Sequence, residues 1–382
     1  MRALALERQW PLTPDRFGSA LVSQAHFQAG VDGAVFTSLG NDVFMDRRAI
    51  SFLIVGVLAG AFLTTGAFAW LARADRDHSG SRRQILKLAH SLPPTAPVHK
   101  AMERFAELVA EKSKGAVEVQ IFPSGQLGTE TETIEQLQRG ALTMVKTSAA
   151  ALEGFLPEMA IFGVPYLFRN EDHFWRVIDG PIGIELLAMC AAADIHGLCY
   201  YDAGARSFYT VSRAVNAPAD LAGLKIRTQR SATSMALIGM LDGSAAAIPF
   251  GELYTALQQG MVDGAENNAP SMYDSRHWEV AKYFSLDEHT RVPDMLVLSR
   301  PIWEKLPAEV QQWLTEAARE SVPYQRKIWA EYEAECLEKL AAEGVTITRP
   351  DQQTFKAAVL PMYETFQGTA IAPIIARVQA VE

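Results

Sequence analysis

From residue 84 onwards the chain alternates between strand-like and helix-like stretches, and this alternation limits its possible folds more than any other feature. Residues 84–89 (QILKLA), 117–122 (VEVQIF) and 142–147 have the pattern of strands. Residues 98–112 and 131–139, which lie between them, have the apolar spacing of helices. A β-α-β-α-β order predicts an α/β fold with a mainly parallel sheet flanked by helices.

Polar residues stand directly after the first and third of these strands. His90 and Ser91 follow the first strand, and Thr147 and Ser148 close the third. Sheets of this kind bind ligands at the carboxyl ends of their strands, so these four residues are candidates for a binding site.

A second series of the same kind follows, with a long helical stretch near its end. We expect Pro323 to kink or divide that stretch, because proline removes a helical hydrogen bond. The expected strands are residues 198–202, 223–227, 245–248, 261–265, 295–299 and 345–348, and the expected helices are residues 234–241, 251–259 and 307–343.

Charge and cysteine content exclude several classes of protein. The 382 residues carry 35 Lys and Arg against 44 Asp and Glu, a net charge of −9, which disfavours binding to nucleic acid. An acidic chain attracts anions only where cationic side chains gather. Three cysteines cannot form a disulfide scaffold. We expect Cys190 and Cys199 to be buried thiols, with a disulfide between them as the alternative, and Cys336 to lie on an inner helix face.

The amino-terminal region is typical of export. Residues 49–72 are 24 residues without a charge, and Arg47 and Arg48 precede them. We interpret residues 45–74 as a signal peptide or, if it is not cleaved, a membrane anchor. Either interpretation places the rest of the chain outside the cytoplasm. Residues 1–44 lack periodicity, and we expect them to be a non-native or disordered extension.

The common enzyme motifs are missing from the sequence. It contains no Gly-x-Gly-x-x-Gly, no Walker phosphate loop, no His-Glu-x-x-His and no Gly-x-Ser-x-Gly. The eight histidines have no metal-binding spacing. We therefore expect neither a cofactor nor a bound metal, and the enzyme interpretation becomes weaker.

Six segments, taken in order, form a recognisable set. They are FAELVAEKSKGAVEVQIFPSGQLG (105–128), VPYLFRN (164–170), GARSFYT (204–210), LAGLKIRT (221–228), IPFGELYTALQQGMVDGAENN (248–268) and YFSLDEHT (283–290). Together they resemble the solute receptors of tripartite ATP-independent periplasmic (TRAP) transporters, and the resemblance runs from about residue 84 to about residue 365.

The resemblance implies a two-lobe periplasmic-binding-protein fold, with a ligand cleft between the lobes and a long connecting helix. A first lobe would hold residues 84–203 and 293–332. A second lobe would hold residues 204–292 and 333–382. The lobes would close around the ligand by a hinge motion.

Three site residues are carried over from the family. Arg227 matches the arginine that pairs with a substrate carboxylate, a role for which a planar, permanently charged guanidinium is well suited. Arg206 matches a second cleft arginine, with a salt bridge between the lobes as the alternative. Asn267 matches an asparagine that hydrogen-bonds the ligand.

Other candidates surround these three. Ser91 and Thr147 match wall positions of the family cleft, and Ser148 is their neighbour. Phe250 would supply an apolar face. The remaining candidates could add polar groups, although each also has a plain structural explanation: they are His90, Gln229, Tyr254 and Asn268.

The resemblance implies an extracytoplasmic receptor that delivers an organic acid to the small and large membrane subunits of a TRAP transporter. The segments "DGAENN" and "SLDEHT" favour a sugar acid such as a hexuronate or aldonate. The alternatives are a receptor for C4-dicarboxylates or other organic acids, and an extracytoplasmic enzyme with Glu252 or His90 as its base.

Overall fold

The computed structural model describes residue 60 and residues 83–382. The chain divides into two units, Met1–Arg76 and Asp77–Glu382. The predicted extension at residues 1–44 lies outside the described residues, and so does all but residue 60 of the predicted signal or anchor. Within the described part, no helix combines the length and the apolar character needed to cross a membrane.

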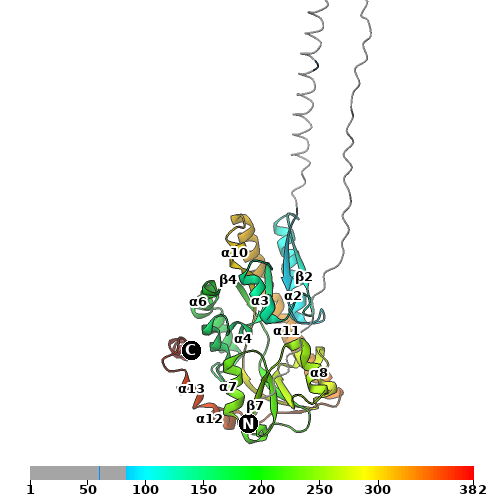
Figure 1. The fold of residues 1–382 in the computed structure, drawn as a ribbon, viewed down its shortest axis with the longest axis vertical. Coiled ribbons are helices and arrows are strands. Elements are labelled where there is room, and N and C mark those ends of the chain that lie inside the picture. The colour runs from blue at the N-terminus through cyan, green and yellow to red at the C-terminus, as the bar shows by residue number, and fades with distance from the viewer. Residues whose placement is uncertain (1–59, 61–82) are drawn as a thin grey trace, which may run out of the picture. The chain divides into compact units, whose positions relative to one another are not determined.

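A five-stranded sheet forms the centre of the first lobe, in the upper half of Figure 1. β1 pairs in parallel with both β2 and β3, as the β-α-β-α-β pattern predicts. β10 runs antiparallel to β3 and to β4 and separates them. In sheet order the strands are β2 (Val117–Phe122), β1 (Gln84–Ala89), β3 (Met144–Ser148), β10 (Asp294–Ser299) and β4 (Ile195–Tyr201).

A six-stranded sheet forms the centre of the second lobe. β6 pairs in parallel with β7 and β8, whereas β5 runs antiparallel to β8 and β9. The sequence patterns did not predict β5 and β9 as strands. In sheet order the strands are β11 (Thr346–Thr348), β9 (Tyr283–Thr290), β5 (Arg206–Thr210), β8 (Gly264–Asn267), β6 (Lys225–Thr228) and β7 (Ser244–Ala247).

The chain passes between the two sheets on short segments. Residues 202–205 lead from β4 to β5, and residues 291–293 lead from β9 to β10. β5 and β10, the strands that follow these crossings, are also the antiparallel strands of their sheets. The two crossings therefore lie where a hinge between the lobes would bend.

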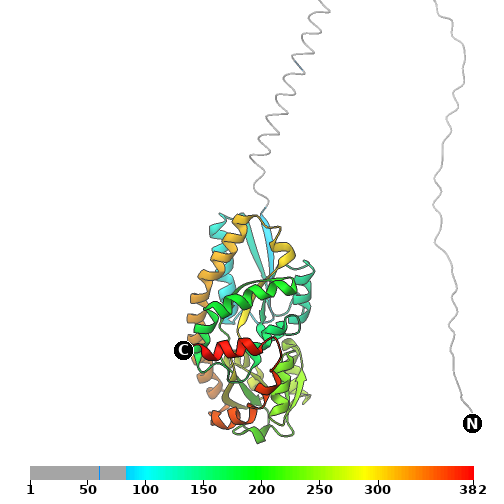
Figure 2. The same ribbon diagram turned by 90° about the vertical axis from the view of Figure 1, so that its left-hand side faces the viewer.

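Helices cover the sheets and link the lobes. The longest, α11, packs against α2 of the first lobe and α9 of the second, and it runs in orange alongside both lobes in Figure 2. The helices are α2 (Pro97–Lys112), α3 (Glu130–Gln138), α4 (Ala149–Leu152), α5 (Glu171–Ile178), α6 (Pro181–Met189), α7 (Ala232–Met240), α8 (Leu253–Gln258), α9 (Ala269–Asp274), α10 (Arg300–Trp303), α11 (Ala308–Ala342), α12 (Gln352–Val359), α13 (Met362–Thr365) and α14 (Ala372–Ala380).

The long helix corrects one expectation. α11 continues for 35 residues with Pro323 inside it, so the prediction that this proline divides the stretch is wrong. Proline removes a single helical hydrogen bond, and the packing of α11 on helices of both lobes outweighs that loss.

The cysteines and the carboxyl-terminal tail complete the fold. Cys190, Cys199 and Cys336 are buried free thiols, so the disulfide alternative is wrong. The lobe boundaries implied by the resemblance place residues 333–382 as a whole in the second lobe. The last helix of this tail, α14, instead packs on α6, and Arg377 pairs with Glu185 at 2.6 Å. The buried residues of α14 belong to the same apolar core as Ile182 and Leu186 of α6; they are Ile374, Ile375 and Val378.

Candidate ligand-binding site

Two adjoining cavities, which we call the cleft, lie between the lobes. The larger has a volume of about 580 Å³ and the smaller, inner one about 40 Å³. Both are lined by residues that follow β1, begin α3, follow β6 and follow β7, as expected for the carboxyl ends of parallel strands. Four residues line both cavities: Ser91, Glu130, Gln229 and Phe250.

Arg227 is the most unusual charged residue of the cleft. It lies on β6, lines the larger cavity and is only 2% exposed. Its Nε donates to the carbonyl of Ile248 at 2.8 Å, and its guanidinium lies 5.8 Å from the centre of the Phe250 ring. Among the described residues, its Nη1 has no hydrogen-bond partner, and no carboxylate forms a salt bridge with it. Burial lowers the pKa of Arg227, as expected for a cation removed from water without a matched anion.

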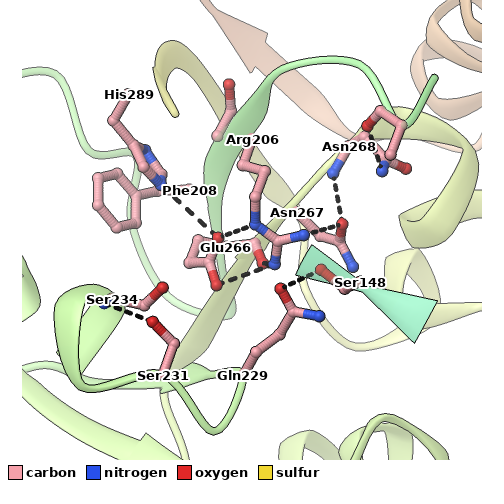
Figure 3. A network of polar contacts seen from close by, with 12 residues as sticks. Ser148, Arg206, Phe208, Gln229, Ser231, Ser234, Glu266, Asn267, Asn268 and His289 are labelled. Atoms are coloured by element: carbon pink, nitrogen blue, oxygen red, sulfur yellow. Dashed lines mark hydrogen bonds and ion pairs between the residues drawn. The ribbon is translucent and has the colours of Figure 1, made fainter. Parts of the chain in front are cut away.

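Arg206, on β5, has a different environment (Figure 3). Its Nε pairs with the Glu266 carboxylate, and its Nη2 donates to Oε1 of the same residue at 2.9 Å. Its Nη1 donates to Oδ1 of Asn267 at 2.9 Å. The salt-bridge alternative therefore describes Arg206 in this structure, but the bridge joins neighbouring strands of one lobe rather than the two lobes. The guanidinium lines the inner cavity with its carboxylate-binding edge already occupied.

Glu266 is stabilised by Arg206 and by His289, which in turn pairs with Asp287. Burial alone would raise the pKa of Glu266, but Arg206 and His289 outweigh it and lower the pKa to about 2. Burial likewise would lower the pKa of His289, but Asp287 and Glu266 raise it to about 9. The His289 ring also stacks on Phe208, with 4.5 Å between ring centres. Arg206 is thus one member of a neutralised, fully buried network.

The polar candidates Ser91, Ser148, Gln229 and Asn267 are brought together at the cleft. Ser148 and Asn267 line the inner cavity, and Ser91 and Gln229 line both cavities. The Ser148 hydroxyl donates to Oε1 of Gln229 at 3.2 Å, which joins the end of β3 to the segment after β6 (Figure 3). Side chains of both lobes therefore meet directly beside the cavity.

A second contact between the lobes lies near this one. Glu153, just after α4, accepts hydrogen bonds from the Thr233 backbone N–H at 3.0 Å and from its hydroxyl at 2.8 Å. The Ser231 hydroxyl also donates to Glu153. Ser231 is itself the N-cap of α7 and accepts from the backbone of Ser234 (Figure 3). A carboxylate of the first lobe thus stabilises a helix start of the second.

Three candidates do not line the cleft. His90 shares a hydrogen bond of 3.0 Å with His99, and burial, with Lys146 and His99, lowers its pKa to about 2. The Thr147 hydroxyl donates to Glu130 at 3.3 Å, and the Tyr254 hydroxyl donates to Glu279 at 2.7 Å. The polar atoms of these three side chains are therefore engaged with other residues.

Asn268 lines the inner cavity but uses its amide elsewhere. Its Oδ1 accepts from the backbone of Ser271 as the N-cap of α9, and its Nδ2 donates to the carbonyl of Ala203. Both ends of the amide therefore hold the backbone in place.

Sequence reasoning missed Glu130, Trp329 and the buried pair of Lys146 with Asp294, which lie 2.9 Å apart and line the inner cavity. Glu130 had a readable signal. Thr129 and Glu132 form a capping box, which places Glu130 at the first position of α3, next to the strand ends. The Lys146–Asp294 pair had no such signal because its members are 148 positions apart and meet only through the pairing of β3 with β10.

Residues 88–369 match the bacterial extracellular solute-binding proteins of family 7. The chain belongs to this family. A TRAP periplasmic solute-binding protein from Bradyrhizobium, solved with galacturonate, is 40% identical with a TM-score of 0.76, and the match covers 78% of this chain and 99% of that one. The protein from Roseobacter denitrificans solved with glucuronate is 34% identical, also with a TM-score of 0.76, over 78% of this chain and 100% of that one.

A third solved structure extends the range of ligands found in this family. The protein from Polaromonas bound to D-erythronate is 34% identical with a TM-score of 0.76, over 78% of this chain and 99% of that one. This family 7 protein therefore has the two-lobe fold of the TRAP solute receptors, as its sequence segments predicted.

Proposed function

We propose that this protein is the periplasmic receptor of a TRAP transporter and that it binds a hexuronate in the cleft. Arg227 carries the proposal. A buried guanidinium with an unpartnered Nη1 is costly unless an anion joins it, and the cleft beside it is large enough for a sugar ring. The uronates in the related structures have the carboxylate that Arg227 requires.

Polar groups around Arg227 suit the rest of a sugar acid. Ser91, Gln229 and Asn267 offer hydroxyl and amide groups, and Phe250 offers an apolar face to the ring. A dicarboxylate would need a second cation for its second carboxylate, and Arg206 is the candidate for that role. Because Arg206 already pairs with Glu266, the dicarboxylate alternative is the less favoured one.

Export and delivery follow from the same proposal. The amino-terminal segment would direct the protein to the periplasm, and the ligand-bound receptor would dock on the small and large membrane subunits. We propose that it catalyses no reaction. Of the two candidate bases, His90 is tied to His99 outside the cleft, and Glu252 is solvent-exposed.

Calorimetric titration with D-galacturonate and D-glucuronate tests the proposal. We expect binding of at least one of them, and a ligand at 100 times Kd should raise the stability by about 2.7 kcal/mol. Arg227→Met should weaken binding by at least about 30-fold, because it removes one partner of a desolvated charge pair.

Arg227→Lys is the matched control, since it keeps the charge but loses the planar fork; we expect an intermediate affinity. Unchanged affinity in Arg227→Met would show that the carboxylate binds elsewhere. Recovery of chemically altered uronate after incubation with the protein would favour the enzyme alternative.

A further inference from the structure

Glu130 occupies an unexpected place for an acidic residue, since it lines both cavities of a site that is proposed to bind an anion. It is half-buried and belongs to the first lobe, whereas Arg227 belongs to the second. The two residues line the same larger cavity from different lobes. A ligand held by Arg227 in this cavity therefore lies in a space that Glu130 also lines.

Only one oxygen of the Glu130 carboxylate is occupied. Oε1 accepts from the backbone N–H of Ser148 at 3.0 Å and from the Thr147 hydroxyl at 3.3 Å. These bonds hold the carboxylate at the end of β3. Among the described residues, Oε2 accepts no hydrogen bond, and no cationic side chain forms a salt bridge with Glu130.

The other buried cations of the cleft are already paired, whereas Glu252 lines the larger cavity as an exposed carboxylate that forms no salt bridge within the described part of the chain. Lys146 pairs with Asp294 and Arg206 pairs with Glu266, so neither is available for an additional anion. Arg230 also lines the larger cavity, but it is solvent-exposed and therefore screened. Within the described lining, Arg227 is the buried cation without a carboxylate partner, so the cleft offers a buried place for a single carboxylate.

We propose that Glu130 determines specificity. Its free Oε2 accepts a hydrogen bond from a ligand hydroxyl, and its charge excludes a second carboxylate. The inference rests on the proposed function and sharpens it: the ligand class is hydroxylated monocarboxylates, and aldarates and C4-dicarboxylates are rejected. An ionised carboxylate only accepts hydrogen bonds, so it suits a hydroxyl donor and repels an anion.

D-Galacturonate and galactarate share a six-carbon skeleton, but galactarate carries a second terminal carboxylate and stays open-chain because it has no aldehyde. D-Galactonate, an open-chain monocarboxylate, is therefore titrated beside them as the control for ring opening. Titration of the parent protein should show galacturonate binding at least about tenfold more tightly than galactarate. Glu130→Gln preserves size and an oxygen for the Ser148 N–H, but it replaces Oε2 by a donor. We expect it to weaken galacturonate binding and to narrow the ratio of the two affinities by about 10- to 100-fold.

Glu130→Asp is the control that keeps the charge, and it should continue to reject galactarate. Glu107→Gln is a control outside the cleft, since Glu107 is exposed on α2 and pairs with Arg104; it should leave the ratio unchanged. Melting temperatures of all variants show whether each remains folded.

The outcomes separate the two proposals. If the parent binds neither acid nor any other uronate, the proposed function fails. If the parent binds galacturonate and Glu130→Gln keeps the parent ratio, the inference about Glu130 alone is overturned. Equal loss of both ligands at an unchanged melting temperature also overturns it, because Glu130 would then shape the cleft rather than select among acids.

Discussion

Arg206 and Arg227 are the same residue type on the same sheet, and both are buried, yet their surroundings differ. Arg206 is neutralised by Glu266, which in turn is supported by His289 and Asp287. Arg227 has a backbone carbonyl and an aromatic face but no carboxylate. Arg206 therefore belongs to a structural ion pair, and Arg227 is the buried cation to which we assign the ligand carboxylate.

The surroundings of the two arginines show what distinguishes a binding site from a structural ion pair. Burying a charge costs several kcal/mol unless a partner compensates it. Where the partner is part of the chain, the charge contributes to the fold. Where the chain supplies no partner, an anion from solution can offset the free energy of burying the cation. Such a site therefore binds anions selectively.

Removal of Arg206 should have the largest effect on stability. Arg206→Met leaves Glu266 with a buried charge and only His289 to compensate it, so we expect a loss of about 3–5 kcal/mol in the free energy of unfolding. Urea unfolding of the ligand-free protein measures it. The double variant Arg206→Met/Glu266→Leu should recover part of the loss, and a loss equal to that of the single variant would contradict a coupled pair.

The pH dependence of stability should come next in size. The folded-state pKa of His289, about 9, lies above its ordinary value of 6.5. The stabilisation from charged His289 is therefore fully present below pH 6.5 and is lost as the pH rises through 9. We expect a loss of about 3 kcal/mol over this range.

Urea unfolding at pH 6.5, 8 and 9.5 tests this expectation, with His289→Gln as the reference that cannot titrate at this position. The variant should be less stable at pH 6.5 and should lose less stability on going to pH 9.5. Parallel curves for the two proteins would mean that His289 is not charged in the folded state.

Removal of Arg227 should have the smallest effect on the stability of the ligand-free protein. Arg227→Met loses the hydrogen bond to the Ile248 carbonyl but also removes an unpaired buried charge. We therefore expect the free energy of unfolding to change by no more than about 1 kcal/mol. A loss as large as that of Arg206→Met would remove the distinction between the two arginines. Binding, in contrast, should depend on Arg227 far more than on any change in stability.

Local patterns determined much of the fold. The alternation of residues 84–89 and 117–122 and the apolar spacing between them predicted β1, α2 and β2 closely, because adjacent residues decide which face of an element is apolar. β5 and β9 were missed. β5 is buried throughout, and five of the eight residues of β9 are buried in an order that does not alternate, so neither shows the pattern by which half-buried strands are found.

The sequence by itself also determined the family and the candidate arginines, since motifs such as "KIRT" are contiguous. Only the tertiary structure decided which arginine is free. Glu266 is 60 positions from Arg206, and the two meet because β5 pairs with β8. Glu130 and Arg227 line one cavity only because the two lobes come together. Whether a charge is matched depends on distances through space, which strand pairing and lobe packing set and which spacing along the chain does not contain.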